Sequence, residues 1–315
     1  MHAIASGVPD QPLVTVIIPT YNRAMLVRDA VRSVLGQTFS DFELIVIDDG
    51  STDGTDRMMG DFDDQRLLYL KQENRGRSAA RNRALSLARG RYIAFLDSDD
   101  LYLKDKLEKQ VALMDLRPDI DMIYTSAICV DEAGRPLEQQ IYTAEVEGDI
   151  YRQVAFFQPV TITLPTVMLR REVLDAVGHF DEQMDRFEDT DLWRRVAKRF
   201  RVGILREPTC ILKTHDDNAL VAQNPEKIIS AIDYYVKKIL REDADVDAGF
   251  LRAGASRLYE YYGRAFLSVA GWRHFGFLLL RKAIMVQPSR SVGICLAAGR
   301  TFLGSLLRRR VAKSQ

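Results

Sequence analysis

The sequence of residues 90–100 is GRYIAFLDSDD; its apolar part predicts secondary structure, and its acidic part predicts a binding site. Residues 92–96 are apolar, which indicates a buried strand. The strand leads directly into Asp97, Ser98, Asp99 and Asp100. Three carboxylates this close repel one another unless a cation neutralises them, and Mg²⁺ and Mn²⁺ prefer oxygen ligands. The stretch predicts a metal site at a strand end; the alternative is that Ser98 and Asp100 only cap the next helix or turn.

Further strands and helices alternate on either side of this stretch. Apolar runs predict strands, and apolar residues at helical spacing predict helices. The expected strands are residues 14–20, 42–49, 67–70 and 122–130, and the expected helices are residues 23–36, 78–89 and 104–116. This alternation predicts an α/β fold with a Rossmann-like, mostly parallel central sheet that is covered by helices on both faces.

The pattern becomes less regular after residue 130. A hairpin turn is expected at residues 131–134, whereas residues 135–186 show no strict alternation. A helix is expected at 188–200 and strands near 202–205 and 210–213. From Pro225 onward the pattern is helical, with an interruption at Pro288.

A second pair of carboxylates follows the strand at residues 42–49. Ligands of open α/β sheets bind beyond the carboxyl ends of the strands, where Asp48 and Asp49 lie. One of them can brace the turn at Gly50, while the other accepts hydrogen bonds from a base or a ribose; a purely structural role for both is the alternative. No GxGxxG follows the first strand, which argues against the dinucleotide-binding type of site.

A third acidic cluster, Glu188, Asp189 and Asp191, begins the helix at 188–200. Acidic residues in a first turn oppose the helix dipole, so part of this cluster needs no functional account. An unpaired carboxylate here would nevertheless suit a general base for an acceptor hydroxyl. His215, in a polar loop, is a candidate metal ligand or phosphate contact, although a lone loop histidine often has neither role.

Five ordered motifs together resemble the inverting family-two glycosyltransferases of bacterial type, which have the GT-A fold. The resemblance covers roughly residues 13–220 and rests on VTVIIPTYNR, ELIVIDDGSTDGT, ENRGRSAARNRAL, GRYIAFLDSDD and FEDTDLWRR. It implies a nucleotide pocket, with Asp49 at the base. The other implied nucleotide contacts are Pro19, Thr20, Tyr21, Arg23, Asp48, one of Arg75 and Arg77, Asp97 towards the ribose, and Ser98.

The resemblance also implies the reactive groups. Asp99, with Asp97 and His215, would hold Mn²⁺ or Mg²⁺ in a DXD motif, and Asp100 would support them. Asp189 falls where the family places its catalytic base, and Glu188 would position the acceptor.

The implied function is metal-dependent transfer of a hexosyl or related group from a nucleotide-diphosphate sugar to a hydroxyl, with inversion. A UDP-sugar is favoured, with dTDP- and GDP-sugars as alternatives, and the acceptor would be a glycan or lipid-linked glycan in polysaccharide, glycolipid or cell-envelope synthesis. Two other readings remain. A metal-dependent nucleotidyltransferase would need a Gly-rich phosphate loop after the first strand, and a catalytically inactive scaffold subunit would be expected to have lost an acidic cluster; neither feature is present.

The expected domain organisation follows from these motifs. Residues 1–12 would be a flexible N-terminus and residues 13–222 the GT-A domain, with a nucleotide-binding half (13–130) and an acceptor-side half (131–222). Residues 223–315 would form a helical region that is cationic and apolar from residue 261.

The net charge of zero conceals an uneven distribution. The chain has 44 basic and 44 acidic residues, but no Asp or Glu follows Glu260, so residues 261–315 carry +10 and residues 1–260 carry −10. A cationic, apolar helical segment predicts contact with an anionic membrane surface; packing on the body is the alternative. No nucleic-acid motif accompanies the charge, so nucleic-acid binding is not expected.

The remaining signals predict a cytoplasmic protein, peripheral to the inner face of the membrane. The first residues lack the basic and apolar regions of a signal peptide, and no run of about 20 apolar residues occurs. Three widely spaced cysteines predict reduced thiols rather than a disulfide framework.

Overall fold

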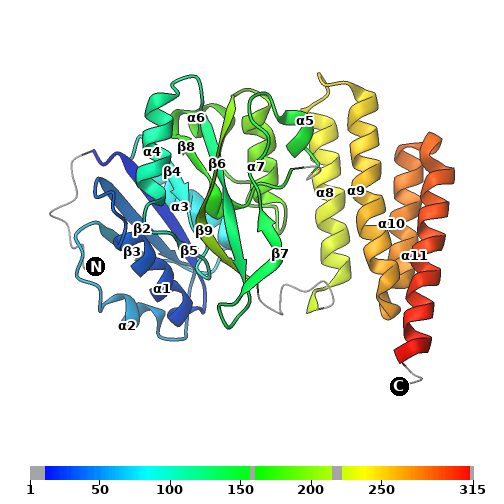
Figure 1. Cartoon of the computed structure of the whole chain (residues 1–315), viewed down its shortest axis with the longest axis horizontal. Coiled ribbons are helices and arrows are strands. Elements are labelled where there is room, and N and C mark those ends of the chain that lie inside the picture. The colour runs from blue at the N-terminus through cyan, green and yellow to red at the C-terminus, as the bar shows by residue number, and fades with distance from the viewer. Residues whose placement is uncertain (1–10, 157–159, 215–221, 313–315) are drawn as a thin grey trace. The chain divides into compact units, whose positions relative to one another are not determined.

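The computed structural model describes residues 11–156, 160–214 and 222–312, and the chain divides into two compact units, Met1–His215 and Asp216–Gln315. The first unit is an α/β structure and the second is helical (Figure 1). The expectations for the first ten residues and for His215 lie outside the described residues.

The first unit begins with the predicted alternation of strands and helices. Its first half contains β1 (Val14–Thr20), α1 (Ala24–Leu35), β2 (Phe42–Asp48), α2 (Thr55–Met59), β3 (Leu67–Lys71), α3 (Arg77–Leu87), β4 (Tyr92–Phe95), β5 (Leu101–Tyr102) and α4 (Lys106–Leu116). Its second half contains β6 (Met122–Val130), β7 (Pro136–Tyr142), α5 (Tyr151–Val154), β8 (Met168–Arg170), α6 (Arg171–Val177), α7 (Glu188–Ala197) and β9 (Val202–Lys213).

These strands form one mixed sheet in the order β3-β2-β1-β4-β8-β6-β9-β5, with β7 paired to β6. The pairs β3–β2, β2–β1 and β1–β4 are parallel, as is β6–β9. The pairs made by β8, β7 and β5 are antiparallel. The predicted α/β class is confirmed, and the antiparallel pairs lie beyond β4, where the sequence alternation becomes irregular.

Helices cover both faces of the sheet, because the central strands β1, β2 and β4 are buried at every position. Alternate side chains of a strand point to opposite faces. Ile17 of β1 and Phe95 of β4 pack in one core cluster with Ala84 of α3 and Trp193 of α7. The intervening side chains, among them Val16, pack in a second cluster with α1 and α4. Apolar side chains on both faces of the strands therefore stabilise two helical layers rather than one.

The structure differs from the sequence predictions in one strand that was split and in two short strands that were missed. The two strands expected near 202–205 and 210–213 are one strand, β9, whose pairing with β6 shifts register next to the exposed residues Arg206 and Glu207. The polar bulge interrupts the apolar pattern without ending the strand. The short strands β5 and β8 were not predicted, because two or three residues are too few to establish a period.

Gly90 lets β4 approach β1. A Cβ at this position would lie 2.4 Å from the backbone nitrogen of Thr15, a distance that real Cβ atoms do not adopt. The N–H of Gly90 donates to Oγ1 of Thr15 at 2.9 Å. Glycine is therefore required here by close backbone approach.

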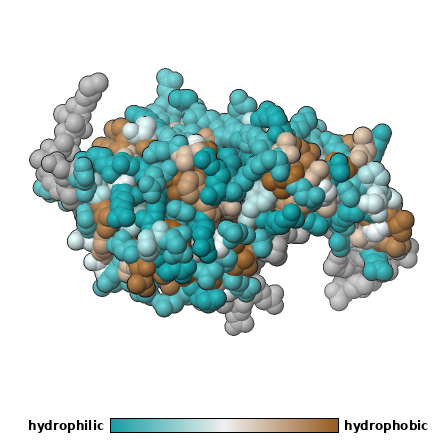
Figure 2. All heavy atoms as spheres, turned by 90° about the horizontal axis from the view of Figure 1, so that it is seen from above, coloured by the Kyte–Doolittle hydropathy of each residue, from teal (hydrophilic) through white to brown (hydrophobic). Residues whose placement is uncertain are grey.

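The second unit is helical, as expected. It contains α8 (Pro225–Glu242), α9 (Ala248–Ser268), α10 (Arg273–Val286) and α11 (Ser291–Ala312), so the chain breaks near residues 243–247 and 269–272 as well as at the predicted Pro288. Helices α9 and α10 cross closely, since a Cβ on Gly276 would lie 2.9 Å from the carbonyl oxygen of Gly263. In the part of the chain that the structure describes, no helix is long and apolar enough to cross a membrane. Figure 2 shows apolar side chains in small groups among hydrophilic ones on the face in view.

Candidate active site

Loops from three neighbouring parallel strands meet at the carboxyl edge of the sheet. Asn22, after β1, adopts a left-handed conformation (φ 52°), and its N–H donates to Oγ of Ser51 at 2.8 Å. The N–H of Thr52, after β2, donates to Oδ1 of Asn22 at 2.8 Å. Arg23 forms an ion pair with Asp99, which follows β4. The loops after β1, β2 and β4 are thus joined by hydrogen bonds and an ion pair.

Asp48 and Asp49 both accept hydrogen bonds from the protein. The buried carboxylate of Asp48 accepts from the N–H of Ser51 at 2.8 Å and from the hydroxyl of Tyr69 at 2.6 Å. Asp49 accepts from the N–H of Arg75 at 2.9 Å and of Gly76 at 2.8 Å. Asp48 therefore braces its own turn, and Asp49 orders the loop that precedes α3.

The acidic cluster after β4 concentrates negative charge. Asp99 is 13% exposed, Asp97 is 34% exposed, and Asp100 is buried and accepts from the N–H of Lys213 at 2.9 Å. Burial and the charges of Asp97 and Asp99 raise the pKa of Asp100 well above its ordinary value. An added cation would relieve this repulsion.

Arg81 connects this cluster to the one at the start of α7. The Arg81 side chain is buried; Nη2 lies 2.7 Å from Oδ1 of Asp97 and Nη1 lies 3.0 Å from Oε1 of Glu188. Arg77, one helical turn earlier, places Nε 2.7 Å from the same Glu188 oxygen. Glu188 is thus held by two arginines, and the guanidinium of Arg81 links α3 to the loop after β4 and to α7.

Asp189 lies beside this network, in the first turn of α7. Its Oδ1 accepts from the N–H of Thr190 at 2.6 Å. Desolvation and the charge of Glu188 raise the pKa of Asp189 to about 6, against the opposing effect of Arg77 and Arg81. A half-buried carboxylate with this pKa is ionised at neutral pH and is still basic enough to accept a proton.

The other predicted nucleotide contacts lie around the same edge without being bonded to one another. Pro19, Thr20 and Ser98 are buried, whereas Tyr21 is 49% exposed. The Oγ1 atom of Thr20 is buried and has no hydrogen-bond partner among the described residues. An orphaned buried hydroxyl at a loop edge is a polar atom that a ligand can satisfy.

The two candidate arginines have different partners. Arg75 lies 3.1 Å from Glu182, while Arg77 contacts Glu188 and donates to the carbonyl of Asp185 at 2.7 Å. Both side chains are more than half exposed. Both Arg75 and Arg77 therefore remain candidates for the nucleotide contact.

Asp97 and Asp99 fit a hard divalent cation. They offer carboxylate oxygens in a patch where burial, together with the charges of Asp97 and Asp99, raises the pKa of Asp100. Among residues 11–156, 160–214 and 222–312, no three acidic, His or Cys side chains gather closely enough to hold an ion. His215, the third ligand expected from the sequence, lies outside those ranges.

Arg81 is the site residue that the sequence analysis missed. It lies within the motif ENRGRSAARNRAL, four residues after Arg77, so both side chains project from one face of α3. The same face of α3 also carries the buried Ala80 and Ala84. Two like charges on a face that is partly buried indicate a carboxylate partner elsewhere in the fold. That signal was present, but it did not identify Glu188 as the partner.

The fold and the site together define a transferase-like α/β architecture of the GT-A type. A family model described as "Glycosyl transferase family 2" matches residues 15–178, slightly more than half of the chain. The chain belongs to glycosyl transferase family 2.

Two curated relatives illustrate the range of the family. An uncharacterised glycosyltransferase of Methanocaldococcus jannaschii is 32% identical over 243 residues, 74% of this chain and 80% of its own length. The E. coli UDP-Glc:alpha-D-GlcNAc-diphosphoundecaprenol beta-1,3-glucosyltransferase WfgD is 43% identical over 116 residues, 36% of this chain and 46% of its own length. The chain spans about a third of the length of several other curated relatives, from Rickettsia species.

Solved structures share the fold. S. aureus TarS 1-349 in complex with UDP-GlcNAc superposes with a TM-score of 0.67 at 21% identity, over 93% of this chain and 88% of that one. The mannosyltransferase PcManGT of Pyrobaculum calidifontis, in complex with GDP-Man and Mn²⁺, gives 0.56 at 19% identity, over 95% and 90%. The predicted GT-A fold and family are confirmed.

Proposed function

We propose that this chain is a metal-dependent, inverting glycosyltransferase that moves a hexosyl or related group from a nucleotide-diphosphate sugar to an acceptor hydroxyl. The observation that carries this proposal is the junction of two acidic clusters through Arg81. Arg81 forms ion pairs with both Asp97 and Glu188, and Asp189, the candidate base, is the residue next to Glu188. Family membership supports the reaction class.

The proposed reaction is a single displacement. The acceptor oxygen bonds to the anomeric carbon while the bond from that carbon to the diphosphate oxygen breaks, and the hydroxyl proton passes to Asp189. Attack opposite the departing group inverts the configuration. Glu188, fixed by Arg77 and Arg81, would orient the acceptor.

The nucleotide would bind at the edge formed by the loops after β1, β2 and β4. The buried Oγ1 of Thr20 and the exposed ring of Tyr21 are its candidate contacts, and Asp49 orders the loop that carries Arg75. Asp97 and Asp99, with His215 as a further candidate ligand, would hold Mn²⁺ or Mg²⁺, which would neutralise charge on the departing diphosphate.

The proposed donor is a UDP-sugar and the proposed acceptor a cell-envelope glycan or its lipid-linked precursor. The WfgD name states a UDP-Glc donor and a diphosphoundecaprenol-linked acceptor. The printed ligands of the two structural neighbours, UDP-GlcNAc and GDP-Man with Mn²⁺, support a nucleotide sugar and a metal in general terms.

We further propose that residues 13–130 bind the donor, that residues 131–222 face the acceptor, and that the cationic segment 261–315 attaches the enzyme to the cytoplasmic face of a membrane. The +10 charge of that segment supports attachment to an anionic surface.

A donor screen tests the central part of this proposal. The full chain is heated with UDP-, dTDP- and GDP-sugars, each with and without Mn²⁺; a bound donor raises the apparent melting temperature. We expect one nucleotide class to stabilise the protein, and only with metal. Equal melting temperatures with every donor would contradict the proposal, and Asp99→Ala should remove the metal-dependent shift.

A further inference from the structure

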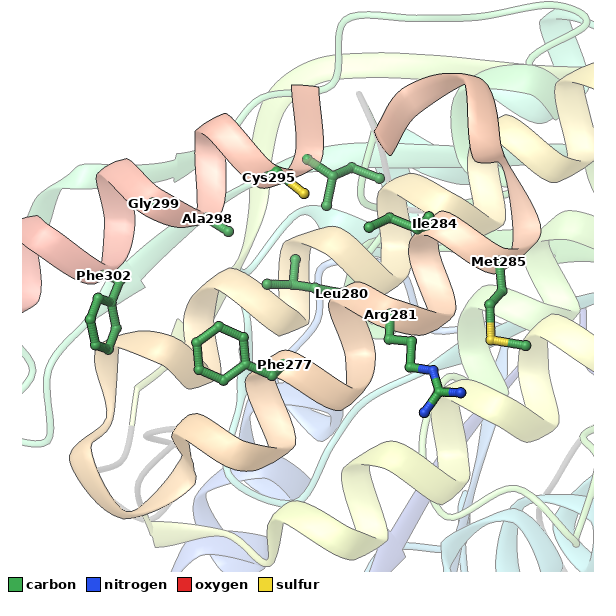
Figure 3. A pocket seen from close by; sticks show the side chains of 10 residues that line it. Phe277, Leu280, Arg281, Ile284, Met285, Cys295, Ala298, Gly299 and Phe302 are labelled. Carbon is green, nitrogen blue, oxygen red and sulfur yellow. The ribbon is translucent and has the colours of Figure 1, made fainter. Parts of the chain in front are cut away.

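The second unit contains an apolar cavity between α10 and α11. Its volume is about 450 Å³, which lies within the range of small-ligand sites. The residues that line it come from these two helices and are Phe277, Leu280, Arg281, Ile284, Met285, Ile294, Cys295, Ala298, Gly299 and Phe302 (Figure 3). Every lining side chain except those of Arg281 and Cys295 is a hydrocarbon, a thioether or glycine.

The cavity is open rather than part of a sealed core. Leu280, Ile294 and Ala298 are buried, whereas Phe277 is 54% exposed and Met285 is 68% exposed. Large apolar side chains that remain in solvent around a cavity mark a surface that binds an apolar partner. At one end, the rings of Phe277 and Phe302 lie 6.2 Å apart, centroid to centroid.

One positive charge stands beside this apolar lining. The guanidinium of Arg281 is exposed and points away from the apolar side chains in Figure 3. Neighbouring cations are neutralised within the unit: Lys282 pairs with Asp233, and Arg290 lies 2.7 Å from Glu260. No carboxylate of the residues described in this unit pairs with Arg281, and no Asp or Glu occurs in α10 or α11.

We infer that this cavity binds one hydrocarbon chain of an anionic membrane phospholipid, whose phosphate contacts Arg281. The inference rests on the membrane attachment proposed above and adds a defined lipid site to it. An alkyl chain matches a lining without hydrogen-bonding groups, and an anionic headgroup matches the exposed cation at its edge and the +10 charge of residues 261–315.

Cys295 supplies a direct readout, because it lines the cavity and is exposed whereas Cys129 and Cys210 are buried. The test measures the rate at which a maleimide alkylates Cys295 in the full chain. The probes are lyso-phosphatidylglycerol below its micelle concentration, lyso-phosphatidylcholine, glycerol 3-phosphate and farnesyl phosphate. We expect lyso-phosphatidylglycerol to slow alkylation strongly, lyso-phosphatidylcholine to need about tenfold more lipid, and glycerol 3-phosphate to have no effect.

Two glycines of α11 provide matched variants. A side chain at Gly299 or at Gly293 would meet no atom within 4 Å of its Cβ, and only Gly299 lines the cavity. Gly299→Leu should fill the cavity and remove protection of Cys295 by lipid, while Gly293→Leu, which adds the same side chain to the same helix, should retain it. Arg281→Gln should reduce the preference for the anionic lipid, whereas Arg300→Gln, on an exposed arginine outside the lining, should not.

Several results would overturn the inference. One is equal protection of Cys295 by lipid in Gly299→Leu and in the unaltered chain. Others are protection by glycerol 3-phosphate alone, or by farnesyl phosphate but not by lyso-phosphatidylglycerol. Protection that grows with protein concentration in the absence of lipid would indicate that a second copy of the chain occupies the cavity. The readout involves neither donor nor transfer. Lipid protection should therefore persist in Asp189→Asn, and a failure of the proposed catalysis would be seen separately.

Discussion

Asp189 experiences two opposing electrostatic effects, and their balance suits a base. Burial and the neighbouring Glu188 disfavour its charged form, while Arg77 and Arg81 favour it. The resulting pKa of about 6 leaves the carboxylate ionised at neutral pH with more proton affinity than a surface aspartate. Asp191, two residues along, is fully buried against Arg194 at 2.8 Å and has a structural role instead.

The rate of sugar transfer should rise with pH and reach a plateau. Only the deprotonated form of Asp189 can accept the acceptor proton, so kcat/KM should increase about tenfold per unit below pH 6 and level off above it. The measurement is UDP release from the preferred donor at saturating Mn²⁺ between pH 5 and about 8. A profile that is flat across pH 6 would contradict the assignment.

Residues at strand ends were predictable because position along the chain determines where they lie. Asp49, Asp97 and Asp99 each follow an apolar strand, and parallel strands place their carboxyl ends together. The role of Arg81 was not predictable, because it depends on Glu188, which lies 107 residues away in sequence. Sequence spacing also could not show that both oxygens of Asp48 are occupied, one by the N–H of Ser51 in the turn and the other by the hydroxyl of Tyr69 in β3.

At the scale of elements, the buried guanidinium of Arg81 joins α3 to the loop after β4 and to α7. A buried charge is stable only when it is paired. Removing the Arg81 cation leaves Asp97 without its arginine and leaves the buried Glu188 with Arg77 alone. The same cation lowers the pKa of Asp189. Stability and catalytic pH dependence are therefore linked through this side chain.

Arg81→Met should lower the free energy of unfolding by about 3–5 kcal/mol, measured by chemical denaturation. In the protein that remains folded, the midpoint of the pH profile should move above 6, because a charge that favours ionised Asp189 is gone. Arg83→Met, on the same helix, is the control and should change neither value appreciably. An unshifted midpoint in Arg81→Met would mean that Arg81 has only a structural role.

Gly90→Ala should destabilise the first unit by about 3 kcal/mol or more, because its Cβ meets the backbone of Val14 and Thr15, which cannot move without disturbing β1. Gly203→Ala is the comparison. The three atoms nearest its Cβ belong to the side chains of Ile120 and Ile123, at 2.5 Å and beyond, and the terminal methyl of Ile120 can rotate away. Thermal unfolding of both variants checks the difference, and equal losses would show that the close approach at Gly90 is not rigid.

The elements that sequence patterns identified are those with many apolar residues in succession. All seven positions of β1 and of β2 are buried, so their character is unambiguous. By contrast, β8 has three residues and pairs between β4 and β6, an arrangement that no local pattern encodes. The bulge in β9 places polar residues inside a strand, which local periodicity interprets as a break.

At the scale of the whole molecule, the zero net charge is the sum of two unlike segments. Residues 1–260 carry a net charge of −10, to which the acidic clusters at the sheet edge contribute, and residues 261–315 carry +10. Part of that positive charge is used internally by Lys282 and Arg290. The net charge of +10 supports the proposed contact of this segment with an anionic surface.

Sedimentation with phosphatidylglycerol-containing vesicles should therefore depend on salt. Raising NaCl from about 0.1 M to about 1 M shortens the screening length from roughly 10 Å to 3 Å and should release most of the protein. Vesicles of phosphatidylcholine alone are the control and should bind little at either concentration. Salt-independent sedimentation would contradict an electrostatic contribution from this segment.

The most direct test of the central claim is donor turnover by Asp189→Asn. The unaltered chain, with Mn²⁺ and the donor identified by thermal shift, should release UDP, and Asp189→Asn should bind UDP and metal with unchanged affinity in a calorimetric titration while its turnover falls by about 100-fold or more. Turnover equal to that of the unaltered chain would remove Asp189 from the reaction and contradict the proposed mechanism.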